Sequence, residues 1–130
     1  MSDRVHPSLE AIATAWPDTL AAIDIGTNSV HMVIARVDVD GRFEVLTRHK
    51  EMVRLGETGD DHLKVLTDAA IDRGVAALAR CRAMIDTYGA QCAAVATSAV
   101  READNRKAFL RRARKEAGIE VEVIAGHEEA

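Results

Sequence analysis

The sequence predicts an α/β fold in which a mixed five-stranded sheet carries helices that connect its later strands. Runs rich in Val, Ile and Ala, separated by turn residues, fill the first half of the chain, and two segments of the second half carry apolar residues at helical spacing. A short apolar run follows each of these two segments. The chain has 130 residues, 48% hydrophobic and 29% charged, which is typical of one globular domain with its own core.

The first three strands are expected to form a meander. Residues 20–25 and 29–39 are dominated by Val, Ile, Ala and Met, and an Asp-Gly pair then marks a hairpin turn. The third strand is expected over residues 43–48 and continues irregularly through Leu55, until Gly56 ends it. Its pattern indicates one half-exposed face.

A long helix is expected after the meander. Thr67 is suited to cap its start, Asp68 lies in its first turn, and Gly89 is a natural stop. One face of this helix carries the apolar residues Ile71, Val75, Leu78, Cys81, Ile85 and Tyr88.

The last part of the chain is expected to continue as strand, helix and strand. Residues 92–96 form a short buried strand, either Asp104 or Asn105 opens a second helix that ends before Gly118, and residues 121–124 form the fifth strand. The helices then cross over between parallel strands in the right-handed sense. The order strand, strand, strand, helix, strand, helix, strand is that of a ribonuclease-H-like domain.

A polar turn between the first two strands is the first candidate site. An apolar run delivers Asp24 into this turn, where Gly26 would let the backbone approach an anion closely. Thr27, Asn28 and Ser29 offer hydroxyl, amide and backbone N–H donors. Ordinary tight turns prefer the same residue types, so this segment alone is compatible with a phosphate cradle or a plain hairpin.

Two further segments are expected to meet this turn. In the predicted topology the ends of strands one, four and five share one edge of the sheet, where open α/β sheets bind their ligands. Asp24, residues 97–101 and residues 127–129 would therefore converge. Arg101 could bind two phosphate oxygens, and a carboxylate of the tail could activate a water. The alternatives are a solvated arginine and the acidic first turn of a helix.

Four short motifs occur along the chain in a fixed order. They are Asp24-Ile25-Gly26-Thr27-Asn28-Ser29, Arg54-Leu55-Gly56, Ala96-Thr97-Ser98-Ala99-Val100-Arg101-Glu102-Ala103 and Gly126-His127-Glu128-Glu129-Ala130. With them, residues 20–130 resemble the amino-terminal part of the exopolyphosphatase and guanosine pentaphosphate phosphohydrolase family. The resemblance implies an enzyme of the actin-like ATPase superfamily, with two ribonuclease-H-like domains, that uses Mg²⁺ to hydrolyse terminal phosphoanhydride bonds of inorganic polyphosphate or guanosine pentaphosphate.

The resemblance also implies roles for individual residues. Glu129 would activate the attacking water, and Asp24 would approach the metal through water. The loop from Gly26 to Ser29 would hold phosphate, and Arg101 would contact phosphate as well. Arg54 carries over more weakly.

Members of this family continue beyond the Glu-Glu-Ala motif into a second domain. We therefore expect residues 20–130 to form the amino-terminal half of the active cleft, and we expect little or no hydrolysis from them alone. The complete protein could form a homodimer. A non-catalytic sensor of guanosine penta- or tetraphosphate and another actin-like ATPase or kinase are the alternative functions. A two-metal nuclease is disfavoured, because the fourth strand ends in Thr97 and Ser98 rather than in an acid.

Composition narrows the possible partners and the compartment. The net charge of −4 and the 3% of aromatic residues argue against a general nucleic-acid coat protein. The basic helix over residues 105–117 is expected to be a solvated face, although it could steer a polyanion. Cys81 and Cys92 form no metal or redox motif, so we expect structural thiols in a reducing compartment.

The amino-terminal segment shows no targeting signal. We expect residues 1–19 to be a leader in which residues 8–16 form either a short helix capped by Ser8 or a loose segment. No apolar run is long enough to span a bilayer. These observations favour a cytoplasmic protein without membrane partners.

Overall fold

The structure, a computed structural model, describes residues 19–57 and 64–124. The strands are β1 (Thr19–Ile25), β2 (Ser29–Val37), β3 (Phe43–Met52), β4 (Gln91–Ala96) and β5 (Val121–Val123). The helices are α2 (Asp68–Tyr88), α3 (Ser98–Glu102), α4 (Arg106–Arg112) and the π-helical turn η2 (Ala113–Ala117), which continues α4. The predicted short helix over residues 8–16 lies outside the described residues.

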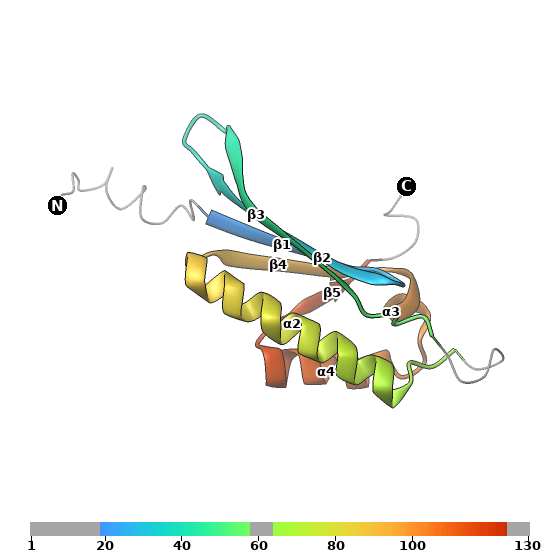
Figure 1. Ribbon diagram of the computed structural model, residues 1–130. Coiled ribbons are helices and arrows are strands. Elements are labelled where there is room, and N and C mark those ends of the chain that lie inside the picture. The colour runs from blue at the N-terminus through green and yellow to red at the C-terminus, as the bar shows by residue number, and fades with distance from the viewer. Residues whose placement is uncertain (1–18, 58–63, 125–130) are drawn as a thin grey trace.

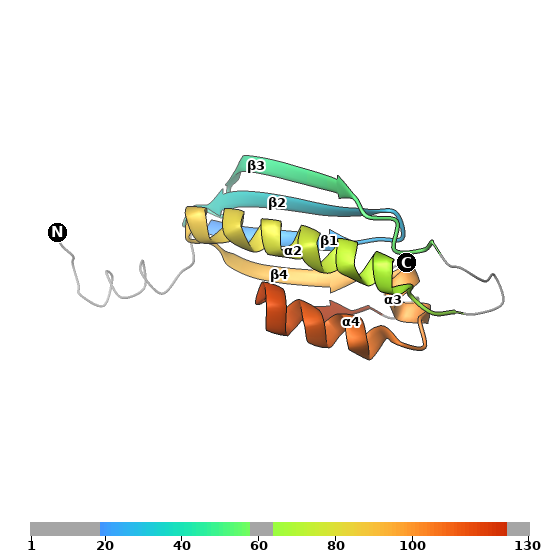
Figure 2. The ribbon, with the colours of Figure 1, turned by 60° about the horizontal axis from the view of Figure 1, so that its bottom comes forward.

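The strands form one mixed sheet in the order β3-β2-β1-β4-β5, with β1 at its centre. β1 pairs antiparallel with β2 and parallel with β4, and β4 pairs parallel with β5. α2 and α4 both lie against the same face of this sheet (Figures 1 and 2). The predicted α/β class, the mixed five-stranded sheet and the ribonuclease-H-like order of elements are confirmed.

β1 separates the two faces of the sheet residue by residue. Its side chains alternate strictly between buried and exposed, and Ile23 and Ile25 lie on the face that α2 and α4 cover. Asp24, between these two isoleucines, therefore lies on the opposite face and is exposed. The alternation follows from the period of two of a strand, and it fixes the side of the sheet on which the Asp24 carboxylate is presented.

The long helix begins and ends as its sequence predicts. The Thr67 hydroxyl accepts a hydrogen bond from the Ala70 N–H at 3.0 Å, and Gly89 ends α2 in the left-handed region with φ of 63°. Inside α2, Gly74 allows close packing, since a Cβ atom there would lie 2.9 Å from a Phe109 ring carbon. This contact brings α2 and α4 together.

The structure differs from the predictions in three places. Residues 98–102, expected as part of a loop, form α3, because Val100 and Arg101 donate their N–H groups to the Thr97 carbonyl. The second predicted strand ends at Val37 rather than at residue 39, since the Asp38 carboxylate accepts two backbone N–H groups and starts the turn early. The third strand is irregular, as expected, with a shift in its pairing with β2 at Leu46, but it ends at Met52 rather than at Leu55.

The second helix opens after Asn105, one of its two predicted first residues, but the Asn105 side chain does not cap it. Its amide instead binds both backbone polar groups of Leu66, at 2.9 Å each. Asn105 therefore joins the start of α4 to the segment before α2.

Within the part of the chain that the structure describes, none of the helices combines the length and the apolar character that crossing a membrane requires.

Candidate functional site

The turn between β1 and β2 is tight. The Gly26 N–H donates to the Ser29 carbonyl at 2.9 Å, and the turn leads from the exposed Asp24 into β2. Gly26 is not among the glycines with positive φ, and a Cβ atom there would lie 3.5 Å from the Ser29 carbonyl oxygen, an ordinary contact. The fold itself therefore does not require glycine at this position.

Asp24 and Ser29 lie on the face of the sheet that α2 and α4 leave uncovered. Asp24 pairs across the sheet with His31 on one side and with Val95 on the other. The Ser29 hydroxyl donates to the Met52 sulfur at 3.5 Å, a weak acceptor that a stronger one can replace. The predicted carboxylate and one predicted hydroxyl are thus near one another on an accessible surface.

A second turn supports the first. Residues 53–57, which we call the supporting turn, follow β3 and lie beside the β1–β2 turn. The Asn28 carbonyl accepts the N–H groups of Val53 at 2.8 Å and of Arg54 at 2.9 Å, and the Thr27 carbonyl accepts the Gly56 N–H at 3.0 Å. These three backbone bonds hold the candidate phosphate-binding turn in place.

Arg54, to which the resemblance assigns a role only weakly, lies where the supporting turn contacts the β1–β2 turn. Among the described residues, Arg54 is the one non-glycine residue with a positive φ, which is 50°. Its side chain is 65% exposed and lies 3.9 Å from a Glu57 carboxylate oxygen. The structure therefore places Arg54 next to the β1–β2 turn and gives its backbone a definite role there.

The end of β4 joins the same edge. The Thr97 N–H donates to the Ile25 carbonyl at 3.1 Å, so α3 begins directly beside the end of β1. Arg101 of α3 donates from Nη1 to the Ile124 carbonyl at 3.3 Å and lies 3.8 Å from the Glu102 carboxylate. Its side chain is only 23% exposed. Arg101 thus reaches from α3 to the chain that leaves β5.

The predicted convergence of the strand ends is confirmed for β1, β4 and β5. Parallel pairing matches Asp24 with Val95, and it matches Val95 with Glu122 of β5. Residues 127–129, with the predicted base Glu129, lie outside the described residues. Ile124, three positions before that segment, donates its N–H to the Ala96 carbonyl at 3.0 Å, so Ile124 itself lies beside the end of β4.

A pocket of about 270 Å³ opens between the β1–β2 turn, the supporting turn and α3. Its polar residues are Thr27, Ser98, Lys64 and Glu102. Sequence reasoning did not place Lys64 beside this pocket or Glu122 on the face of Asp24, because neither residue belongs to a motif of phosphate chemistry. The only signal for Glu122 is its place between two valines of a strand, which puts it on the same face as Asp24.

Asp24 presents an exposed carboxylate to a magnesium ion at this edge, and Glu122 lies on the same face two strands away. Among residues 19–57 and 64–124, no group of three or more His, Cys, Asp and Glu side chains is arranged to hold a metal. Mg²⁺ usually keeps several waters and binds one or two carboxylates together with substrate phosphates. The Asp24 carboxylate beside the candidate phosphate-binding turn fits that use, with water completing the coordination.

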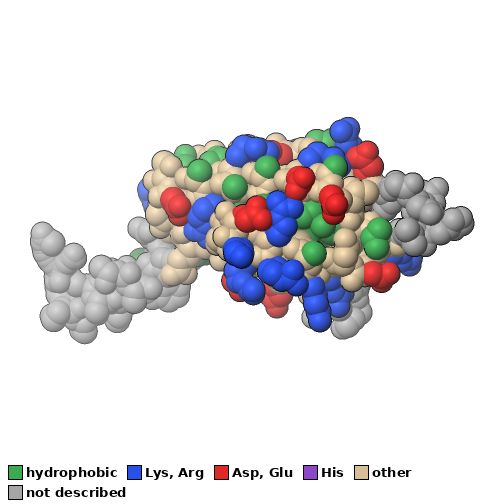
Figure 3. Space-filling model, turned by 90° about the horizontal axis from the view of Figure 1, so that it is seen from below, with side chains coloured by type: hydrophobic (Ala, Val, Ile, Leu, Met, Phe, Trp, Pro, Cys, Tyr) green, Lys and Arg blue, Asp and Glu red, His purple; other side chains and the backbone are tan. Residues whose placement is uncertain are grey.

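The helix-covered face carries Lys and Arg side chains interspersed with Asp and Glu (Figure 3). Arg112 of α4 binds Asp72 at 2.6 Å and Glu116 at 2.7 Å, and these bonds raise the pKa of its guanidinium. Arg114 lies 3.8 Å from Glu120. These ion pairs agree with the expected solvated face of the basic helix.

Comparison with known proteins gives consistent results. Residues 33–130 match the Ppx/GppA phosphatase family. A Haemophilus influenzae protein provisionally named an exopolyphosphatase is 40% identical over 112 residues, which are 85% of this chain and 34% of that protein.

Two solved structures are similar as well. The Aquifex aeolicus member of the Ppx/GppA family is 33% identical, with a TM-score of 0.79 over 85% of this chain and 36% of that one. An exopolyphosphatase from Cytophaga hutchinsonii is 35% identical, with a TM-score of 0.80 over 85% of this chain and 35% of that one. The chain spans about a third of the length of these relatives.

Proposed function

Because this chain belongs to the Ppx/GppA phosphatase family, we propose that it contributes one half of the active cleft of a phosphoanhydride hydrolase. The substrate is inorganic polyphosphate or guanosine pentaphosphate, and the terminal phosphate is released. The observation that carries this proposal is the meeting of the Gly26–Ser29 turn with the start of α3 at the ends of β1 and β4.

The arrangement suits the needs of phosphoryl transfer. This chemistry depends on positioning, on neutralising charge and on an oriented water, and it requires no covalent nucleophile. A rigid backbone turn supplies the positioning, and Arg101 supplies a positive charge at the same edge. Arg101 donates to the Ile124 carbonyl, which holds its guanidinium beside the end of β5.

Each residue has a distinct proposed role. Gly26, Thr27, Asn28 and Ser29 bind phosphate oxygens through backbone and side-chain donors. Asp24 would hold a Mg²⁺ ion through water, and that ion would supply neutralisation of phosphate charge. Glu129 accepts the proton of the attacking water.

The relatives are about three times as long as the chain, so we propose that the cleft is closed by a second domain of the same protein. Residues 1–130 alone are then expected to release little or no phosphate. The cleft is proposed to operate in the cytoplasm.

Phosphate release by the complete protein tests the proposal. We expect hydrolysis of polyphosphate, of guanosine pentaphosphate or of both, dependent on Mg²⁺. Glu129→Gln is expected to keep substrate binding and to lose about 10²- to 10⁴-fold in turnover, the usual contribution of a general base. Binding of guanosine pentaphosphate without any phosphate release would instead identify a sensor, and wild-type turnover by Glu129→Gln would remove Glu129 from the mechanism.

A further inference from the structure

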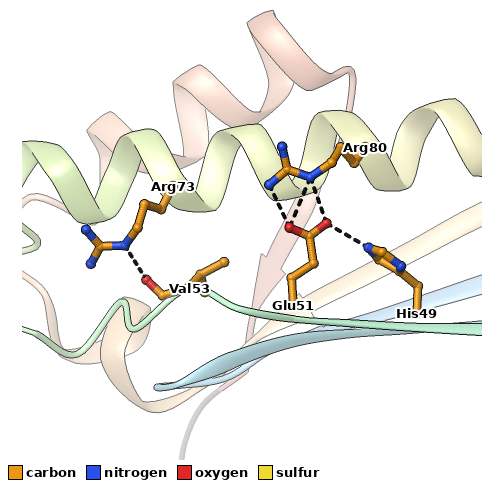
Figure 4. Close-up of polar contacts among 5 residues, drawn as sticks. All are labelled: His49, Glu51, Val53, Arg73 and Arg80. Carbon is orange, nitrogen blue, oxygen red and sulfur yellow. Dashed lines mark hydrogen bonds and ion pairs between the residues drawn. The ribbon is translucent and has the colours of Figure 1, made fainter.

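Arg73 of α2 binds three acceptors of the supporting turn. Its Nε donates to the Val53 carbonyl at 2.8 Å, and its Nη2 donates to the Arg54 carbonyl at 3.2 Å and to the Glu57 carboxylate at 2.9 Å. Figure 4 shows the guanidinium reaching from the helix to the backbone of Val53. The side chain is 33% exposed. A planar guanidinium is suited to this, because its donors are fixed in one fork.

The bonds continue from the supporting turn to the β1–β2 turn. Val53 and Arg54 accept from Arg73 through their carbonyls, and their N–H groups donate to the Asn28 carbonyl at 2.8 and 2.9 Å. The same two residues are therefore held on both sides, by the helix and by the candidate phosphate-binding turn. An unbroken set of hydrogen bonds leads from α2 to Asn28.

The conformation of Arg54 makes this support necessary. Non-glycine residues rarely adopt a φ of 50°, and such a conformation persists when the surroundings hold it. Arg73 binds the carbonyl of Arg54, while Asn28 accepts its N–H. Without Arg73 the supporting turn would relax toward an ordinary backbone conformation and would pull its N–H groups away from Asn28.

We propose that Arg73 is a positioning residue for the Gly26–Ser29 turn, acting through residues 53–57 and without touching substrate. The effect of Arg73 on catalysis rests on the proposed function of that turn. Its effect on the geometry of the turn is independent of that function.

Arg80 offers a matched control on the same helix. It extends from α2 toward β3, as Arg73 does, and binds the Glu51 carboxylate at 2.6 Å (Figure 4). Glu51 belongs to the strand β3, so these bonds do not hold the supporting turn. Arg73→Gln and Arg80→Gln therefore remove equal charge from one helix, but only Arg73→Gln removes hydrogen bonds to the supporting turn.

Amide hydrogen exchange, followed by NMR on the full chain, tests the geometry. In Arg73→Gln we expect the N–H groups of Val53, Arg54, Gly56 and Gly26 to exchange about tenfold faster or more, since hydrogen bonds to charged groups are lost. In Arg80→Gln these four are expected to exchange as in the wild type. Equal exchange at Gly26 in both variants would overturn the proposal.

Steady-state kinetics of the complete protein provides the second readout. Arg73→Gln is expected to raise the KM for polyphosphate several-fold more than it lowers kcat, while Arg80→Gln stays near the wild type in both. Unchanged kinetics in Arg73→Gln, with faster exchange at Gly26, would refute the role of Arg73 in catalysis. A wild-type protein that hydrolyses neither substrate would refute the proposed function, and the exchange result would still decide the positioning role.

Arg73→Lys keeps the test informative if Arg73→Gln does not fold. A lysine keeps the positive charge beside Glu57, but a single ammonium group cannot reproduce the planar fork toward three acceptors. We expect faster exchange at Val53 and Arg54 in this variant as well. Wild-type exchange there would show that charge alone supports the turn, which contradicts the proposal.

Discussion

Thr27 occupies the space that a side chain at Gly56 would need. A Cβ atom built on Gly56 would lie 2.4 Å from Cγ2 of Thr27, and the Gly56 N–H donates to the Thr27 carbonyl at 3.0 Å. The two turns at the edge of the sheet therefore contact each other closely through backbone and methyl group together. Glycine at this position follows from packing and not from a positive φ.

Gly56→Ala is expected to destabilise the chain. The added methyl must displace Thr27, and overpacking of this kind costs about 1–3 kcal/mol in the free energy of unfolding. Urea unfolding measures the loss. Thr27→Ser removes Cγ2, so the double variant should regain most of the stability that Gly56→Ala loses, whereas simple additivity of the two changes would contradict the contact.

Gly26→Ala is expected to separate stability from binding. The methyl would meet only the Ser29 carbonyl at 3.5 Å, so we expect the free energy of unfolding to stay within about 0.5 kcal/mol of the wild type. The same methyl would stand where we propose that phosphate oxygens approach the backbone. In the complete protein, phosphate release should fall at least tenfold, and full activity in Gly26→Ala would exclude a close approach at this residue.

Gly74→Ala tests the packing of α2 against α4. Alanine favours a helix over glycine by about 1 kcal/mol, but its methyl would lie 2.9 Å from Phe109 and 3.1 Å from Leu55. Both neighbours are fully buried, so the cost of about 1–3 kcal/mol for overpacking should exceed the gain. Urea unfolding should show a net loss. Ala76→Gly, at an exposed position of the same helix, should lose only the propensity difference.

Glu51 is expected to make stability sensitive to acid. The pKa of Glu51 lies below its ordinary value of 4.5, mainly because Arg80 donates a hydrogen bond to its carboxylate. His49, whose Nε2 lies 2.7 Å from Oε2 of Glu51, lowers this pKa as well. A carboxyl whose pKa is lowered by folding stabilises the folded state above its unfolded pKa. That contribution is lost as the pH falls through the folded pKa.

Urea unfolding as a function of pH tests this expectation. As the pH falls below the ordinary glutamate pKa of 4.5, the wild type should lose more stability than Glu51→Gln. Glu44→Gln, on the same strand, is the control, since Glu44 lies 4.0 Å from Arg36 in an exposed pair. Equal pH profiles for the wild type and Glu51→Gln would show that the Arg80 pair contributes nothing to stability.

Local signals predicted most of the fold. Alternating and continuous apolar runs marked the strands, and the cap at Thr67 and the stop at Gly89 marked α2. The short helix α3 was not predicted, because five residues are too few to show helical periodicity. The bonds of the Asn105 side chain to the backbone of Leu66 were not predicted either, because Leu66 is distant in sequence.

The candidate site was predictable as a set of motifs but not as a set of contacts. The Gly26–Ser29 turn and the segment with Arg101 were expected at one edge, and the ends of their strands meet there. The support of Asn28 by Val53 and Arg54 could not be read from residue types, since it uses backbone groups. Arg73 looked like any charged residue on a helix, and only the packing of α2 beside β3 gives it partners.

The two turns of the site are synthesised before β4. The supporting turn, the Gly26–Ser29 turn and Arg73 all precede β4, and their mutual contacts close short loops, which form faster than distant ones. Thr97 contacts β1 only when β4 pairs with β1, and these two strands are far apart in the sequence. During synthesis the turn can therefore be shaped before Arg101 exists, and the docking of β4 is the folding step that brings the two parts of the site together.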